Sequence, residues 1–100
     1  MDIVEYMKNQ GAIDFFNSQP IKKAYLFGSY SRQEETPESD LDILVDLDKS
    51  VNLFQFIFIK LSLEKLLNKK VDLLSSNGLS PRLKPYIETE KILIYEKQNQ

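Results

Sequence analysis

The chain contains no cysteine and no histidine, and only seven of its 100 residues are glycine or proline. Without cysteine there is no disulfide framework and no thiolate zinc site. Without histidine there is no imidazole general base and no serine–histidine nucleophile pair. The low glycine and proline content, together with 42% hydrophobic residues, excludes a low-complexity or disordered chain. Any chemistry must therefore use carboxylates, hydroxyl groups, lysine, arginine and the backbone.

A concentration of positive charge is also missing, since the formal net charge is −2. We therefore expect no direct contact with nucleic acid, which is typically bound by a basic surface. Residues 1–50 hold ten acidic and five basic residues, whereas residues 51–100 hold five acidic and eight basic residues. This asymmetry favours a local acidic site near the middle of the chain over a diffuse acidic surface.

Long uninterrupted apolar segments are absent as well. The most hydrophobic segment, residues 53–67, is interrupted by five polar or charged residues and cannot span a bilayer. The N-terminal residues lack the basic and apolar regions of a signal peptide. We expect a cytoplasmic protein without membrane association, and the length predicts a single domain over residues 1–100.

Segments with helical and with strand character alternate along the chain. We expect helices over residues 2–17, with Asp2 as N-cap, over residues 53–67, and after Ser80 and Pro81, which suit the first positions of a helix. Gly11 either interrupts the first helix or splits it in two. The predicted strands cover residues 21–27, 41–47 and 71–74, and residues 92–95 form a fourth strand or a packed terminal turn. This alternation predicts an α/β (α+β) fold with helices packed against a small mixed sheet.

The segment over residues 53–67 has apolar side chains around more of its circumference than one buried face needs. Two interpretations remain open at this stage. The helix packs deeply against the sheet, or it carries a second apolar face for a partner chain.

Three aspartates stand on predicted strands. Because successive side chains of a strand alternate between its faces, Asp40 and Asp42 project together while Leu41 points to the core. Two adjacent carboxylates repel each other unless a cation lies between them. Asp72 lies in an apolar strand, where a buried and unpaired charge would be costly. If the two strands are neighbours, the three carboxylates form a cluster suited to two Mg²⁺ ions and phosphoryl displacement.

A possible phosphate-binding segment precedes the aspartates. Gly28, at the end of a predicted strand, allows close approach of the backbone to a phosphate, and Ser29 offers its N–H and hydroxyl groups. Arg32 would add an always-protonated donor over the same phosphates. Each part is weak evidence alone, but the order of Gly-Ser, spacer, paired acids and a third acid points to nucleotide chemistry.

Gly-Ser, ten residues and Asp-x-Asp resemble the signature of the DNA polymerase beta-like nucleotidyltransferase superfamily. The shortness of the chain and residues 71–74 and 92–96 resemble its minimal nucleotidyltransferase (MNT) branch. The resemblance implies the polymerase beta-like nucleotidyltransferase fold and assigns Gly28 and Ser29 to triphosphate binding, with Arg32 at a commonly basic position. The catalytic and metal-binding carboxylates that it implies are Asp40, Asp42 and Asp72.

The resemblance also implies a function. It indicates transfer of AMP from ATP, with two Mg²⁺ ions, to a hydroxyl group of a partner protein. The implied partner is a HEPN-type ribonuclease toxin, with which this chain would form a hetero-oligomer as the antitoxin. A catalytically idle, steric antitoxin and a transferase acting on RNA or a small molecule remain as alternatives. The presence of all three carboxylates favours an enzyme, and the lack of a basic surface and of an acceptor-binding domain disfavours RNA or a small molecule.

Overall fold

A computed structural model describes residues 2–98 of the chain. The elements are α1 (Ile3–Asn9), α2 (Ala12–Ser18), β1 (Ile21–Phe27), β2 (Leu41–Leu47), α3 (Leu53–Leu67), β3 (Val71–Ser75), α4 (Lys84–Glu90) and β4 (Ile92–Glu96), with short 3-10 turns at Gly28–Tyr30 and Ser76–Gly78. The predicted strands over residues 21–27 and 41–47 are confirmed, and the third is one residue longer than predicted. Residues 92–95 belong to a fourth strand rather than to a terminal turn.

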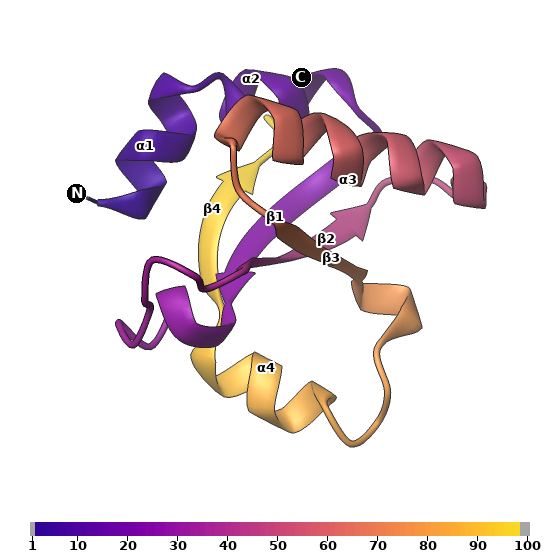
Figure 1. The fold of residues 1–100 in the computed structure, drawn as a ribbon. Helices are drawn as coiled ribbons and strands as arrows, with labels where there is room; N and C mark the ends of the chain where they lie inside the picture. The colour runs from indigo at the N-terminus through magenta and orange to yellow at the C-terminus, as the bar shows by residue number, and fades with distance from the viewer. Residues whose placement is uncertain (1, 99–100) are drawn as a thin grey trace.

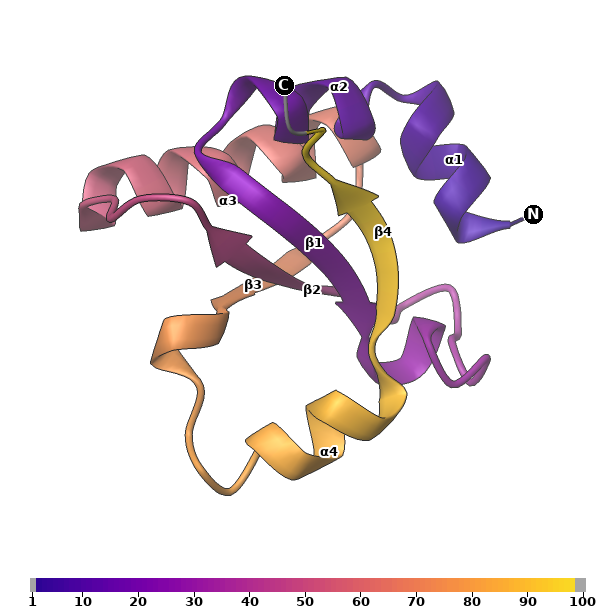
Figure 2. The same cartoon turned by 180° about the vertical axis from the view of Figure 1, so that it is seen from behind.

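The four strands form one mixed sheet in the order β3-β2-β1-β4 (Figures 1 and 2). β1 runs antiparallel to both of its neighbours, β2 and β4. β2 and β3 are parallel, which requires a crossover, and α3 provides it. The predicted α+β class with a small mixed sheet is confirmed.

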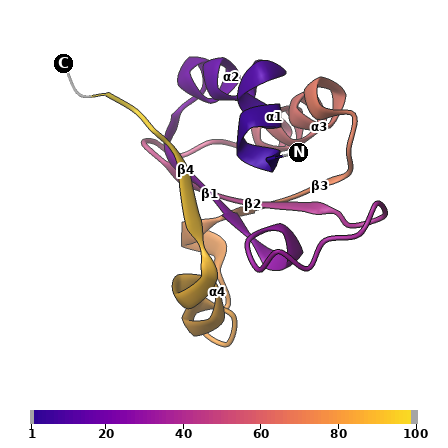
Figure 3. The same ribbon diagram turned by 90° about the vertical axis from the view of Figure 1, so that its left-hand side faces the viewer.

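Helices lie on both faces of this sheet. α1, α2 and α3 cover one face and α4 lies against the other (Figure 3). The main core, which includes Phe16, Ile43 and Leu63, fills the space between the sheet and the first three helices. A smaller cluster on the opposite face joins Ile87 of α4 to Leu44 of β2. Side chains of β2 that point away from the main core therefore face the side of α4.

The N-terminal helical segment is two helices that meet at Gly11. The predicted cap of α1 is present, because Asp2 Oδ1 accepts a hydrogen bond from the Val4 N–H at 2.9 Å. Gly11 has a φ of 88°, in the left-handed region that disfavours other residues. The chain changes direction there before α2 begins.

The prediction that Ser80 and Pro81 open the last helix is wrong. The Ser80 hydroxyl accepts a hydrogen bond from the Arg82 N–H at 3.2 Å, which closes a turn and not the first turn of α4. α4 begins at Lys84 and has Pro85 in its first turn, where a missing N–H removes no helical hydrogen bond.

α3 is apolar on two faces: its packing against the sheet is confirmed, and the use of its second apolar face by a partner chain stays a prediction. Ile59, Leu63 and Leu67 are fully buried against the sheet. Five large side chains remain exposed, and we call them the α3 apolar face: Leu53, Phe54, Ile57, Phe58 and Leu61. Within residues 2–98, no helix is both long and apolar enough to cross a membrane.

Candidate active site

Two aspartates lie side by side on the parallel strands β2 and β3. Asp42 and Asp72 are register partners, and both alternate with core residues, so they face the side of α4. Asp42 is half-buried, whereas Asp72 is exposed because β3 is an edge strand. The predicted adjacency of the two strands is confirmed, but the argument that Asp72 is buried is wrong. Asp40 is exposed and precedes β2 instead of lying within it.

Of the three aspartates, Asp42 is the one whose carboxyl group has a clearly shifted pKa. Burial raises the pKa of its carboxyl group to about 6, and the negative charges of Asp72 and Asp40 add to the effect. A cation bound there would offset the repulsion among the carboxylates and favour the ionised form of Asp42. Within residues 2–98, no three acidic side chains are already gathered into a metal-binding group. The metal-binding roles of the three aspartates stay predictions.

Gly28 brings the end of β1 against the Asp42 side chain. It is buried and has a φ of 75°, and a Cβ at this position would overlap the Asp42 carboxylate. Only glycine combines this backbone conformation with so close a contact. Ser29 follows in the 3-10 turn and is partly exposed. The predicted Gly28-Ser29 pair therefore begins next to Asp42, and its role in phosphate binding stays a prediction.

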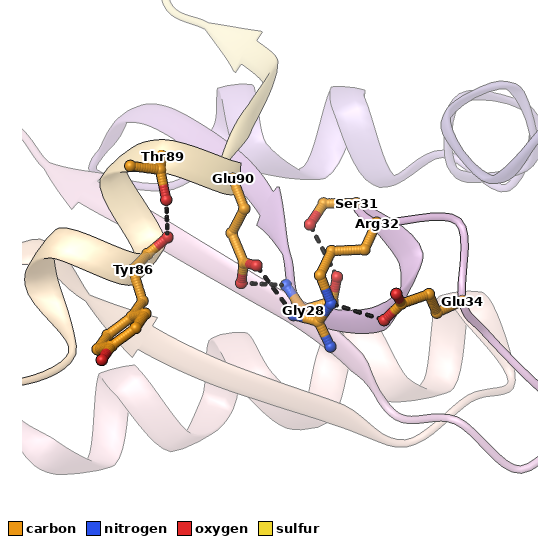
Figure 4. Close-up of polar contacts among 7 residues, drawn as sticks. All are labelled: Gly28, Ser31, Arg32, Glu34, Tyr86, Thr89 and Glu90. Carbon is orange, nitrogen blue, oxygen red and sulfur yellow. Dashed lines mark hydrogen bonds and ion pairs between the residues drawn. The ribbon is translucent and has the colours of Figure 1, made fainter.

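Arg32 lies beside this turn with its guanidinium group between two glutamates. Its Nε donates a hydrogen bond to Glu34 at 2.9 Å, and its Nη1 donates one to Glu90 at 2.9 Å (Figure 4). The contact with Glu34 first, and then that with Glu90, raises the pKa of the Arg32 guanidinium group. The sequence predicted Arg32 as a phosphate ligand and gave no indication of these carboxylate partners.

Glu90, at the end of α4, is the site residue that the sequence analysis missed. Its Oε1 accepts a hydrogen bond from the Gly28 N–H at 3.1 Å (Figure 4). The antiparallel pairing of Leu26 with Ile92 explains the contact, because continuing that register by two residues sets position 28 opposite position 90. The sequence left residues 92–95 undecided between strand and turn, so it named no partner for β1.

At the acidic end of the sheet, the side chains of Asp40 and Asp72 are exposed to solvent. A hollow of about 500 Å³ lies elsewhere, lined by residues such as Tyr6, Tyr30 and Lys69, and it includes none of the aspartates discussed above. We locate the site by its chemistry. Carboxylate oxygens suit a divalent cation, and backbone N–H, hydroxyl and guanidinium donors beside them suit phosphate groups.

Comparison with known proteins identifies the family of this chain. The family model described as polymerase beta, nucleotidyltransferase matches residues 3–100. A protein of Methanocaldococcus jannaschii named "putative protein adenylyltransferase" is 40% identical over 72 residues, which cover 72% of this chain and 77% of the relative.

Two solved structures share the fold. The structure of a "putative minimal nucleotidyltransferase" superposes with a TM-score of 0.73 and 33% identity, covering 92% of this chain and 95% of the other. The structure of a tri-AMPylated Shewanella oneidensis HEPN toxin in complex with its MNT antitoxin superposes with a TM-score of 0.68 at 24% identity. That match covers 93% of this chain and 74% of the other, and at this identity it shows the fold alone.

Proposed function

This chain belongs to the minimal branch of the polymerase beta nucleotidyltransferase family, and from that premise we propose that it transfers AMP from ATP to a hydroxyl group of a partner protein. The observation that carries the proposal is the parallel register that places Asp42 beside Asp72, with Gly28 packed against Asp42. Paired carboxylates beside backbone donors are what a nucleotidyl transfer needs.

The nucleotide phosphates would bind at the turn after β1. Gly28 lets the backbone approach closely, and Ser29 contributes its N–H and hydroxyl groups. Arg32 retains donors beyond those used by its two glutamate partners, because a guanidinium group has five N–H bonds. These groups would hold the β- and γ-phosphates and leave the α-phosphorus toward the aspartates.

The donor set of the acidic end fits Mg²⁺. Asp40, Asp42 and Asp72 provide only hard oxygen ligands. Burial raises the pKa of Asp42, and so do the negative charges of Asp72 and Asp40, which a divalent cation would offset. We expect these three residues to hold two Mg²⁺ ions. When bound, the ions would supply charge neutralisation and a lower pKa for the acceptor hydroxyl.

The acceptor hydroxyl would approach from the open side of β3. Asp72 is exposed there and would accept the hydroxyl proton as the oxygen forms its bond to the α-phosphorus. The bond between the α-phosphorus and the bridging oxygen breaks, and pyrophosphate leaves with the bonding electron pair. An open site of this kind can receive a side chain presented by another protein.

A HEPN-type toxin is the partner that we propose. One structure with the same fold is an MNT antitoxin in complex with a HEPN toxin carrying three AMP groups, which is the product such a transfer would give. The α3 apolar face offers a contact surface for this partner, since Phe54 is 82% exposed and Phe58 is 55% exposed.

Intact mass measurement of the partner tests the proposal directly. The chain is co-expressed with the product of the neighbouring gene, and the purified complex is incubated with ATP and Mg²⁺. We expect the partner to gain the mass of one or more AMP units. The Asp42→Asn variant should abolish this gain, whereas Asp46→Asn, a change of a half-buried aspartate on the same strand, should preserve it.

The outcomes separate the competing functions. A complex that forms without any mass gain with ATP or another nucleoside triphosphate would identify a steric antitoxin. AMP found on RNA and not on protein would identify a different acceptor. An Asp42→Asn variant with wild-type turnover would refute the metal assignment.

A further inference from the structure

Glu90, at the end of α4, contacts two groups of the turn after β1, the Gly28 N–H and the Arg32 guanidinium group. One carboxylate oxygen accepts the hydrogen bond of the Gly28 N–H at 3.1 Å. The other accepts that of Arg32 Nη1 at 2.9 Å (Figure 4). A single side chain therefore fixes both the start of the 3-10 turn and the guanidinium group beside it.

The fold holds Glu90 in this place from two directions. Three residues before it, Ile87 is buried against Phe27 and Leu44 on the same face of the sheet. Two residues after it, Ile92 pairs with Leu26 in the β4–β1 ladder. The Glu90 side chain is 22% exposed, and its hydrogen bond to the Gly28 N–H is partly shielded from water, whereas its contact with Arg32 lies at the surface.

The contacts of Glu90 orient Arg32 without using all of its donors. Glu34 takes the Nε–H and Glu90 takes one N–H of Nη1, which leaves three of the five N–H bonds for a phosphate. Two partners on adjacent edges of the planar group define its plane. Within the described part of the chain, no hydrogen bond engages the Ser29 hydroxyl. Glu90 and a phosphate can therefore bind this loop at the same time.

We propose that Glu90 is a positioning residue for the nucleotide phosphates, acting through Gly28 and Arg32. This role rests on the proposed function, because it presupposes that the turn after β1 receives the triphosphate. Glu90 stays in place when nucleotide binds, and it couples α4 to the phosphate-binding turn. It touches neither the nucleotide nor the reacting atoms.

Shortening the side chain separates its reach from its charge. Glu90→Asp keeps the negative charge but removes one methylene, so the carboxylate no longer reaches both partners. We expect the affinity for Mg·ATP, measured by calorimetry, to fall about tenfold, the usual effect of losing one charged hydrogen bond. Glu88→Asp is the matched control, because Glu88 is on the same helix and its ion pair, at 3.1 Å, is with Lys91 and not with a residue of the turn. Its affinity should stay within about twofold of wild type.

Two further measurements distinguish positioning from general support of the fold. The affinity for AMP, which lacks the β- and γ-phosphates, should be unchanged in Glu90→Asp, whereas a loosened site would weaken both ligands. In an Arg32→Ala background, Glu90→Asp should cause less than half of its effect in the wild-type background, because the two residues act together.

The results that overturn the inference are distinct from those that overturn the function. If wild-type protein binds no Mg·ATP, the proposed function fails and this role with it. If wild-type protein binds and Glu90→Asp binds equally well, only the role of Glu90 fails. Tighter binding by Glu90→Asp would likewise refute it, since Glu90 would then compete with the phosphate.

Discussion

Replacing Asp42 by asparagine should stabilise the nucleotide-free, metal-free protein while removing the proposed transfer activity. The pKa of this carboxyl group rises from an ordinary value of 3.8 to about 6, mainly because it is half-buried, and further because of Asp72 and Asp40. A change of this size corresponds to at most about 3 kcal/mol. Solvent reaches the group, so screening reduces the expected penalty to about 1–2 kcal/mol.

The dependence on pH has a definite sign. Because the pKa of Asp42 is higher in the folded state, folding favours the protonated carboxyl, and stability is lost as pH rises from 3.8 through about 6. Above about pH 6 the ionised Asp42 carboxylate lowers the free energy of unfolding by its full amount. Asparagine carries no such proton, so the advantage of the variant should be small near pH 4 and complete at about pH 7 and above.

Urea unfolding of both proteins at about pH 4.5 and about pH 8, without divalent cations, measures the difference. Asp46→Asn is the control, because Asp46 is half-buried on the same strand but is not among the charges that raise the pKa of Asp42, so its removal should bring no comparable gain. Adding Mg²⁺ at a hundred times its Kd should stabilise the wild type by about 2.7 kcal/mol and the Asp42→Asn variant by less. A wild-type protein that is more stable than Asp42→Asn at pH 8 without metal would refute the reasoning.

Three further predictions follow from local geometry. Gly28→Ala should destabilise the protein by about 3 kcal/mol in urea unfolding, because the left-handed backbone and the overlap with Asp42 act together. The control Gly11→Ala, which has the same kind of backbone but no atom within 4 Å of the added Cβ, should lose about 1 kcal/mol. Equal losses would contradict the contact between Gly28 and Asp42. Gln33→Gly should raise the free energy of unfolding by about 0.5–1 kcal/mol, since Gln33 has a φ of 59°, and a loss of stability would count against this backbone conformation. Phe58→Ser on the α3 apolar face should weaken co-purification with the HEPN-type partner. The control Leu93→Ser, which alters a side chain on β4 that is 48% exposed, should not weaken it. Unchanged binding by Phe58→Ser would exclude this face as the contact surface.

Local sequence patterns predicted most helices and strands, because the pattern of apolar residues within each segment is enough to identify it. The alternation in β2 sends Leu41 and Ile43 to the core, and the length and composition of α3 identify it without knowledge of its neighbours. The start of α4 was misplaced for the same local reason. Ser80 and Pro81 satisfy the preferences of a helix start, but the chain uses them in a turn.

The site residues that could be predicted from the sequence are those that lie close together in one segment of the chain. Gly28, Ser29 and Asp42 lie within 15 residues of one another and form a recognisable motif. Glu90 contributes through the pairing of β1 with β4, and hydrophobic patterns do not specify which strands pair. The exposure of Asp72 depends on β3 being an edge strand, which is a property of the whole sheet.

The order of strands in the sheet also has a consequence for the growing chain on the ribosome. β1 is central, yet one of its two neighbours, β4, is the last strand described and pairs with it across nearly 70 residues of sequence. A nascent chain ending before α4 would contain all three aspartates but could form neither hydrogen bond of Glu90. Contacts of this sequence separation form late, because closing a long loop is slow. Nucleotide binding should therefore appear only after residues 84–96 have been synthesised, in a single step with the docking of β4.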